Sequence, residues 1–229
     1  MHSQKDMIDR DADKRLAAVA AVREVCDDML VGLGTGSTAT HAIAALAERR
    51  LRIETVATSH ASAKLAESLG LRVRDFAEVS RVDLAIDGAD AIDAELYAVK
   101  GAGGAMLREK VVADAADRMI VIADGSKRAQ RLGGTPLPVE ILPFAKSYVV
   151  ARLAHFFDRT AERPNYRTDN GNIVVDGHGW DDTALQTLAD SLVAIPGVVG
   201  HGLFLREIDA AYIADGGIVT RLERGRNPR

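Results

Sequence analysis

Short apolar runs alternate with alanine-rich stretches in the first half of the chain, and this alternation predicts strands and helices in turn. Each run is followed by glycine or a polar residue, which is typical of the buried strands of a parallel sheet built from βα units. The predicted helices are residues 11–25, 37–50, 61–69 and 105–116, and the predicted strands are residues 29–34, 53–58, 71–73, 82–87 and 119–123.

The pattern changes after residue 132, where a turn-rich run of glycine and proline is followed by elements in the order βαββαβ. The two central strands are expected to form a hairpin around Asn170-Gly171, a common hairpin turn. This order is that of a small ferredoxin-like domain. The other elements are a strand at residues 139–142, a helix at 147–158, a helix at 182–192 and a strand at 198–204.

Residues 209–222 contain two further strand-like runs, which we interpret as returning to the first domain. The sequence therefore predicts an α/β protein of two domains. A Rossmann-like parallel-sheet domain comprises residues 1–132 and 205–229, and a smaller ferredoxin-like α+β domain comprises residues 133–204.

Composition narrows the class of protein. The 229 residues carry 29 Lys and Arg against 33 Asp and Glu, and the net charge of −4 argues against nucleic-acid binding. No apolar run approaches the length of a membrane span, and the polar N-terminus does not resemble a signal peptide. The single cysteine, Cys26, cannot form an internal disulfide and is expected to be a buried thiol. We expect a cytoplasmic protein.

A glycine-rich loop, Gly-Thr-Gly-Ser-Thr at residues 34–38, follows a predicted strand and opens a predicted helix. Such a loop lets the backbone approach a ligand, and N–H groups at a helix start favour an anion such as phosphate. The lysine of an NTPase P-loop is absent. The next strand ends in Ala57-Thr58-Ser59, without the acid of a dinucleotide-binding unit. A phosphate loop and a turn needed only for packing remain, and the hydroxyl groups favour the phosphate loop.

Two acidic residues stand at the end of another predicted strand, in the run Asp87-Gly88-Ala89-Asp90: Asp87 is the last residue of the strand and Asp90 follows three residues later. In open α/β sheets, ligands bind at the carboxyl ends of the strands, where Asp87 should lie. Two neighbouring carboxylates are suited to proton exchange or to binding sugar hydroxyls. An equally good interpretation is a turn whose Asp side chains accept backbone N–H groups. A metal site is not predicted, because no His or Cys lies within ligand spacing.

Lys100 precedes the glycine-rich run at residues 101–104 and a predicted helix, again an arrangement suited to an anion. Glu109 falls in an otherwise apolar helical row with Val112 and Ala116. Burial there would raise the pKa of Glu109 into the range useful to a general base. The alternative is an exposed glutamate paired with a neighbouring cation, which is the commoner situation for a lone helical Glu.

Lys127 follows the strand at residues 119–123, either within reach of a shared site or as a solvated loop lysine. Four strand ends thus bring glycines, carboxylates and lysines to one sheet edge. The residues alone predict a small phosphorylated, hydroxyl-bearing ligand and acid–base chemistry, without naming the reaction.

These motifs resemble the type A ribose-5-phosphate isomerase family, in family order and over nearly the whole chain. The resemblance implies interconversion of D-ribose 5-phosphate and D-ribulose 5-phosphate, with no metal or organic cofactor, in a homodimer or homotetramer. It also implies the predicted two-part fold. The motifs are residues 34–38, 87–90, 100–104 with 107–110, 124–127, 137–140 (Leu-Pro-Val-Glu), 168–172 (Thr-Asp-Asn-Gly-Asn) and 195–199.

The resemblance also implies roles for particular residues. Glu109 is the general base, while Asp87, Asp90 and Lys100 line the reacting end and serve ring opening and oxygen protonation. The implied substrate-binding positions are Thr35, Gly36, Ser37, Thr38, Asp87, Gly88, Ala89, Asp90, Lys100, Gly101, Ala102, Gly103, Lys127 and, on the first helix, Lys14. The alternatives are a non-catalytic sugar-phosphate effector domain and a sugar-phosphate deaminase or another isomerase.

Two positions depart from the family pattern. Ala102 replaces one glycine of the Lys-Gly-Gly-Gly-Gly run, so this position should not need a positive φ. Ala91 stands where the family commonly has Glu after Asp-Gly-Ala-Asp. If that Glu made a contact, another group must supply it here.

Overall fold

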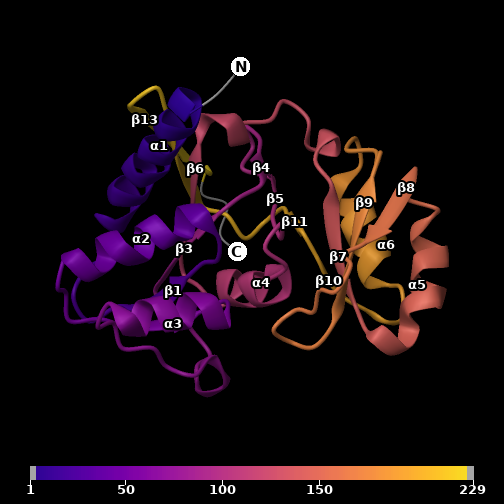
Figure 1. Ribbon diagram of the computed structural model, residues 1–229, viewed down its shortest axis with the longest axis horizontal. Helices are drawn as coiled ribbons and strands as arrows, with labels where there is room; N and C mark the ends of the chain where they lie inside the picture. The colour runs from indigo at the N-terminus through magenta and orange to yellow at the C-terminus, as the bar shows by residue number, and fades with distance from the viewer. Residues whose placement is uncertain (1–3, 226–229) are drawn as a thin grey trace.

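A six-stranded sheet forms the larger part of the molecule in the computed structural model, which describes residues 4–225 (Figure 1). Five strands are parallel and the sixth, β13, pairs antiparallel to β12 at the edge. The last two strands, β12 and β13, therefore belong to this sheet, as the sequence predicted. In spatial order the strands are β2 (Glu54–Ala57), β1 (Leu30–Leu33), β3 (Leu84–Gly88), β6 (Met119–Asp124), β12 (Ala210–Asp215) and β13 (Ile218–Glu223).

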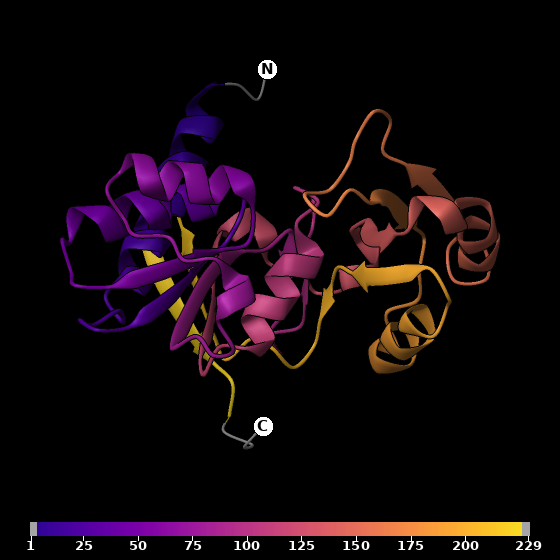
Figure 2. The ribbon, with the colours of Figure 1, turned by 90° about the horizontal axis from the view of Figure 1, so that it is seen from below.

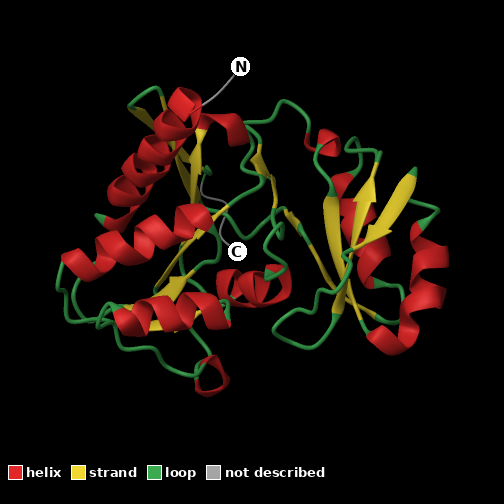
Figure 3. Cartoon of the chain, viewed as in Figure 1, coloured by secondary structure: helices red, strands yellow, loops and turns green. Residues whose placement is uncertain are grey.

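Helices cover both faces of this sheet, because alternate strand residues point to opposite sides. Ile120 and Ile122 of β6 pack in one cluster with α1 and α2, and Val121 packs in another with α4. Helix α3 adds Ala66 to the first cluster. Figure 3 shows these helices around the sheet. Their bounds are α1 (Gln4–Val22), α2 (Ser37–Glu48), α3 (His60–Ser68) and α4 (Met106–Asp114).

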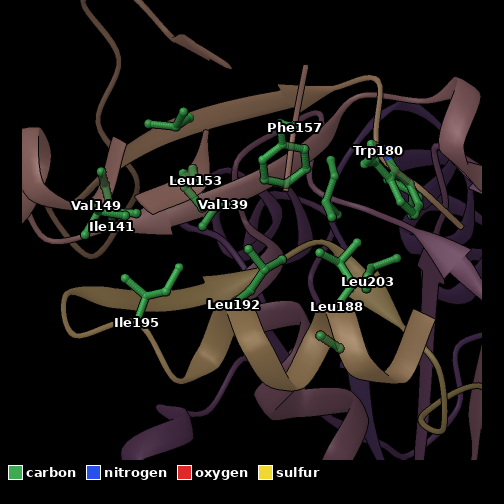
Figure 4. Packing of buried hydrophobic residues seen from close by; sticks show 14 of the residues in the cluster. Val139, Ile141, Val149, Leu153, Phe157, Trp180, Leu188, Leu192, Ile195 and Leu203 are labelled. Atoms are coloured by element: carbon green, nitrogen blue, oxygen red, sulfur yellow. The ribbon is translucent and has the colours of Figure 1, made fainter. Parts of the chain in front are cut away.

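The segment between β6 and β12 forms a second, antiparallel sheet in the order β10-β7-β9-β8. Its elements follow the predicted order βαββαβ and have their own apolar core, in which Leu188 and Leu192 of α6 face the strands (Figure 4). Figure 2 shows this sheet beside the larger part. The elements are β7 (Leu137–Ile141), α5 (Lys146–Leu153), β8 (Arg159–Glu162), β9 (Ile173–His178), α6 (Leu185–Val193) and β10 (Val198–His201).

Three very short strands, β4 (Ala91–Ile92), β5 (Ala98–Val99) and β11 (Leu203–Phe204), form a third sheet. The prediction of one strand over residues 198–204 is thus only half right, because Gly202 interrupts it: its N–H donates to Pro138 and its carbonyl accepts from Lys100. Residues 98–99 immediately precede Lys100, so their pairing in this sheet fixes the position of the Lys100 backbone.

Of three other predictions about the structure, two are wrong and one is right only in part. Residues 71–73 form no strand and contribute only a single bridge between Val73 and Thr55. The strand pair expected around Asn170-Gly171 is present, because β8 and β9 pair antiparallel. The two strands are joined by a longer loop, residues 163–172, and Asn170-Gly171 lies in a tight turn at its end. Cys26 is exposed rather than buried.

The strand order identifies the edge where a ligand is expected. The chain moves from β1 to β2 on one side and to β3 on the other, and α/β sheets bind ligands in the crevice at such a switch point. Over residues 4–225, no helix is long and apolar enough to cross a membrane.

Candidate active site

The loops after β1 and β3 meet at the switch point. The backbone N–H of Thr35 donates to Oδ1 of Asp87 at 3.0 Å, and Gly88 N–H donates to the same oxygen at 2.7 Å. Gly34 makes this contact sterically feasible, because a Cβ there would lie 2.0 Å from Asp87 Oδ1. Asp87 Oδ1 therefore holds the loops after β1 and β3 together. This oxygen has the turn-capping role that the sequence allowed for Asp87, but the other oxygen does not.

The other oxygen of Asp87 belongs to a buried charge cluster. Nζ of Lys100 lies 2.9 Å from Asp87 Oδ2 and 3.3 Å from Glu109 Oε2, and it also donates to the carbonyl of Gly88. The exposed fractions are only 2% for Asp87, 2% for Lys100 and 4% for Glu109. The expectation of an exposed, surface-paired Glu109 is thereby excluded, and the apolar row on α4 does bury it.

The electrostatics of the cluster follow from one cation facing two carboxylates. Burial raises the pKa of Glu109 to about 8; the charge of Asp87 adds to the rise and Lys100 opposes it. Burial raises the pKa of Asp87 as well, against the pull of Lys100. Burial alone would lower the pKa of Lys100, but the two carboxylates outweigh it and raise the pKa. Glu109 is therefore the group suited to exchanging a proton near neutral pH.

Lys100 is held at both ends. Its backbone N–H donates to the carbonyl of Gly202 at 2.8 Å, where a side chain on Gly202 would collide with the Lys100 carbonyl. Its ammonium lies 5.4 Å from the centre of the Phe204 ring. Both partners come from the chain beyond β10, a link that the sequence did not reveal.

Hydroxyl groups line the first glycine loop and the helix start behind it. Thr35 Oγ1 lies 2.8 Å from Thr58 Oγ1 and 3.4 Å from Ser62 Oγ. Gly36, at the N-cap of α2, has a φ of 108° and no side chain to cap the helix, so the first N–H groups of α2 lack a side-chain acceptor. Ser37 is exposed at this end and accepts a hydrogen bond from Lys14 Nζ at 3.1 Å.

The second glycine loop lies against the first. A Cβ on Gly103 would be 3.6 Å from the methyl group of Thr35. Positive φ values fall on Gly101 and Gly104, whereas exposed Ala102 is not among the positive-φ residues. The expectation that Ala102 needs no glycine conformation is thus met. Its N–H donates to Asp90 Oδ2 at 2.8 Å, so Asp90 holds this loop as Asp87 holds the other.

The remaining predicted positions lie at the same sheet edge. Thr38 is buried near Gly88, and Ala89 is half-buried beside it. Lys127 is half-buried in the 3-10 turn Gly125–Lys127, after β6, the strand beside β3. Ala91 turns away: it is 3% exposed and packs in the core of the second sheet, so no side chain at this position faces the charge cluster.

Two residues of the loop that joins β8 to β9 contact the second glycine loop, which sequence reasoning missed. Arg163 Nη1 donates to the carbonyl of Ala102 at 2.9 Å, and the Tyr166 hydroxyl donates to the carbonyl of Gly103 at 2.8 Å. Gly104 leaves room for this, since a Cβ there would lie 2.0 Å from the Tyr166 oxygen. No local motif signals such a long-range contact.

Fold and site together define an α/β protein with an uncapped helix start at its sheet edge and a buried cluster of one lysine and two carboxylates. Residues 54–217 match the family model described as ribose 5-phosphate isomerase A (phosphoriboisomerase A). The ribose-5-phosphate isomerase A of Sphingopyxis alaskensis is 48% identical, over 93% of this chain and 97% of that protein. The chain belongs to the ribose 5-phosphate isomerase A family, as its motifs predicted.

Solved structures agree with this assignment. The crystal structure of ribose 5-phosphate isomerase A from Neisseria gonorrhoeae superposes with a TM-score of 0.92 at 36% identity, covering 95% of this chain and 98% of that one. A D-ribose-5-phosphate isomerase in complex with phospho-erythronic acid has a TM-score of 0.90 at 30% identity, covering 94% and 99%. The predicted α/β fold class is therefore confirmed.

Proposed function

We propose that this chain interconverts D-ribose 5-phosphate and D-ribulose 5-phosphate, with Glu109 as the general base. The observation that carries the proposal is the Glu109 carboxylate, buried at 4% exposure, 3.3 Å from the Lys100 ammonium, with its pKa raised to about 8. A base with a pKa near the working pH is the most effective for proton transfer.

The reaction moves one proton between neighbouring carbons. Glu109 removes the proton from C2 of the open-chain aldose, which leaves an enediolate with its charge on O1, and later returns this proton to C1. The proton of the C2 hydroxyl passes to O1, so that C2 becomes the ketone carbonyl and O1 a hydroxyl. One carboxylate serves both steps, as a glutamate does in triosephosphate isomerase. The positive charge of Lys100 stabilises the negative oxygen that develops next to the reacting carbon.

Ring opening must precede this step, because the sugar is mostly cyclic. Opening moves a proton from the anomeric hydroxyl and adds one to the ring oxygen. Asp87 and Asp90 are the nearest acid–base groups for this, since Asp87 is the penultimate residue of β3, Asp90 follows its end, and each holds one of the two glycine loops.

The phosphate fits the edge formed by Thr35, Gly36, Ser37 and Thr38, where the start of α2 offers N–H groups that lack a side-chain cap. Lys14, which donates to Ser37, and Lys127, after β6, supply positive charge. The sugar hydroxyls fit the polar groups between the two glycine loops, at Gly88, Ala89, Gly101, Ala102 and Gly103. The complex of a related isomerase with phospho-erythronic acid supports a ligand that carries a phosphate.

The domain boundaries, the cellular location, the pathway and the assembly of the chain are proposals as well. We assign residues 1–132 and 205–229 to a catalytic domain and 133–204 to a small domain; separate apolar clusters support this division, although Ala91 and Val99 pack into the small core. We assign the chain to the cytoplasm, to the non-oxidative pentose phosphate pathway and to a homodimer or homotetramer. A non-catalytic effector domain is disfavoured, because it needs no buried base.

The decisive experiment offers ribose 5-phosphate to the purified protein and follows ketose formation. Turnover in D₂O should incorporate solvent deuterium into the product, because the proton on Glu109 exchanges while it is held there. Binding of ribose 5-phosphate without turnover would identify an effector domain. Turnover with complete retention of the original hydrogen would show that the reaction proceeds by a hydride shift and not through an enediolate.

A further inference from the structure

Two motifs of the family pattern, residues 137–140 and 168–172, contain no proposed site residue, yet they meet in the second sheet. Glu140 on β7 is fully buried, and its Oε1 accepts three hydrogen bonds from the turn at residues 168–172. The donors are Thr168 Oγ1 at 2.8 Å, Asn172 Nδ2 at 2.9 Å and Asn170 Nδ2 at 3.0 Å. Three donors on one carboxylate oxygen hold the turn in a single conformation.

The other side of this turn reaches the larger part of the molecule, at the start of two helices (Figures 1 and 2). Arg108 on α4 donates from Nε to Asn170 Oδ1 at 2.8 Å and from Nη2 to the Asp169 carbonyl at 3.0 Å. The backbone N–H of His60, the first residue of α3, donates to Asp169 Oδ2 at 2.7 Å.

The amide of Asn170 is therefore oriented from both ends. Its Nδ2 donates to Glu140, which turns its Oδ1 toward Arg108. Arg108 directly precedes Glu109 in the first turns of α4. Asn170 itself is exposed, so its side chain adds little to the core, whereas Asn172 makes the matching bond to Glu140 while buried and is not bonded to Arg108.

We propose that Asn170 is a positioning residue for the reaction: oriented by Glu140, it fixes Arg108 and thereby the Glu109 carboxylate next to Lys100. The inference rests on the proposed role of Glu109 as the base. It gives residues 137–140 and 168–172 one shared purpose, which is to align the start of α4 from the second sheet.

The matched pair Asn170→Ala and Asn172→Ala separates positioning from stability. Each variant removes one amide donor from the same Glu140 oxygen. Asn170→Ala should lower kcat about 10-fold, less than the ~100-fold that a 1 Å misplacement costs, with little change in KM or melting temperature. Asn172→Ala should lower the melting temperature more and keep kcat within about 2-fold of wild type, since it leaves the bond to Arg108 in place. Equal losses of kcat in the two variants would overturn the proposal.

A double-mutant cycle tests the route through Arg108. If Asn170 acts on Glu109 only through this residue, adding Arg108→Ala to Asn170→Ala should lower kcat no further than Arg108→Ala alone. Losses that multiply would mean that the two side chains act independently, and the proposed route would be wrong.

Hydrogen exchange supplies a readout that does not depend on turnover. Asn170→Ala should speed amide exchange in residues 106–110 relative to both wild type and Asn172→Ala, because the first turns of α4 lose a tether. Unchanged exchange would count against the inference. Failure of the wild-type protein to turn over ribose 5-phosphate would instead refute the proposed function, and the exchange data would still decide whether the tether exists.

Discussion

Oε2 of Glu109 and Nζ of Lys100 lie 3.3 Å apart, and both side chains are almost fully buried. The same ammonium lies 2.9 Å from Asp87. With both carboxylates ionised, the cluster carries one excess negative charge in a largely buried place. A proton on Glu109 removes that excess, so the charge of Asp87 adds to the rise in the pKa of Glu109 that burial causes.

Replacing Glu109 by Gln should lower kcat by about 10²–10⁴-fold, the usual contribution of a general base, with a much smaller change in KM. The amide keeps the shape of the side chain but cannot accept the proton. Steady-state kinetics with ribose 5-phosphate measures both constants. Asp114→Asn, at the exposed end of the same helix, is the control and should behave as wild type. Near-normal turnover of Glu109→Gln would end the assignment.

The activity should depend on pH through the same residue. A base must be unprotonated to act, so kcat/KM should rise with pH and level off above about 8, the pKa of Glu109 in the free protein. A pH–rate profile of kcat/KM measures this. A profile that is already flat between pH 4.5 and about 8 would mean that Glu109 is not the titrating base.

The contribution of Glu109 to the free energy of unfolding should decrease with rising pH, whereas kcat/KM should increase. The folded state holds the Glu109 proton up to about pH 8, whereas an ordinary glutamate, as in the unfolded chain, releases it near 4.5. The folded chain thus binds more protons, and this residue's contribution to the free energy of unfolding decreases as pH rises between these values. Thermal melts of wild type and Glu109→Gln across this range measure the difference, and the advantage of the variant should grow with pH. Parallel curves would contradict the raised pKa.

Replacing Lys100 by Met should lower kcat/KM by about 10²-fold or more, because the oxyanion loses its fixed positive charge. It also leaves two buried carboxylates without a cation, so the variant should lose more stability at high pH than at low pH. Lys110→Met is the matched control: Lys110 lies on α4 and pairs with Glu207 at 3.2 Å. That control should lose stability but keep its kcat, and an unchanged kcat/KM in Lys100→Met would remove Lys100 from the reaction.

Gly34→Ala should damage the site by crowding alone. Its Cβ would meet Asp87 Oδ1 at 2.0 Å, so the carboxylate must leave both loops, with an expected loss of about 1–3 kcal/mol in stability and a lower kcat. Gly134→Ala, where a Cβ meets nothing within 4 Å, should change stability by less than about 0.5 kcal/mol. Denaturant unfolding compares the two, and equal effects would show that the close approach of Gly34 to Asp87 is unimportant.

The sequence predicted the parts of the site that depend on local structure. Glycine turns after strands and the apolar row on α4 locate Asp87, Lys100 and Glu109, since each signal lies within a few residues of its consequence. The ion pairs among them depend on tertiary packing, which local pattern does not encode. The same limit explains residues 71–73, where an apolar run alone did not specify a pairing partner. It also explains Asn170-Gly171, which lies between the paired strands β8 and β9 but in a longer loop, where Asn170 donates to the distant Glu140.

The insertion of the second sheet between β6 and β12 has a consequence for folding. These two strands are parallel neighbours, with Ile120 opposite Ala210, yet the whole antiparallel unit lies between them in the chain. Such a distant pairing closes a long loop, and long-range closures slow folding. We therefore expect β12 to dock late, after the inserted unit has collapsed, so that the hairpin of β12 and β13 completes the sheet last.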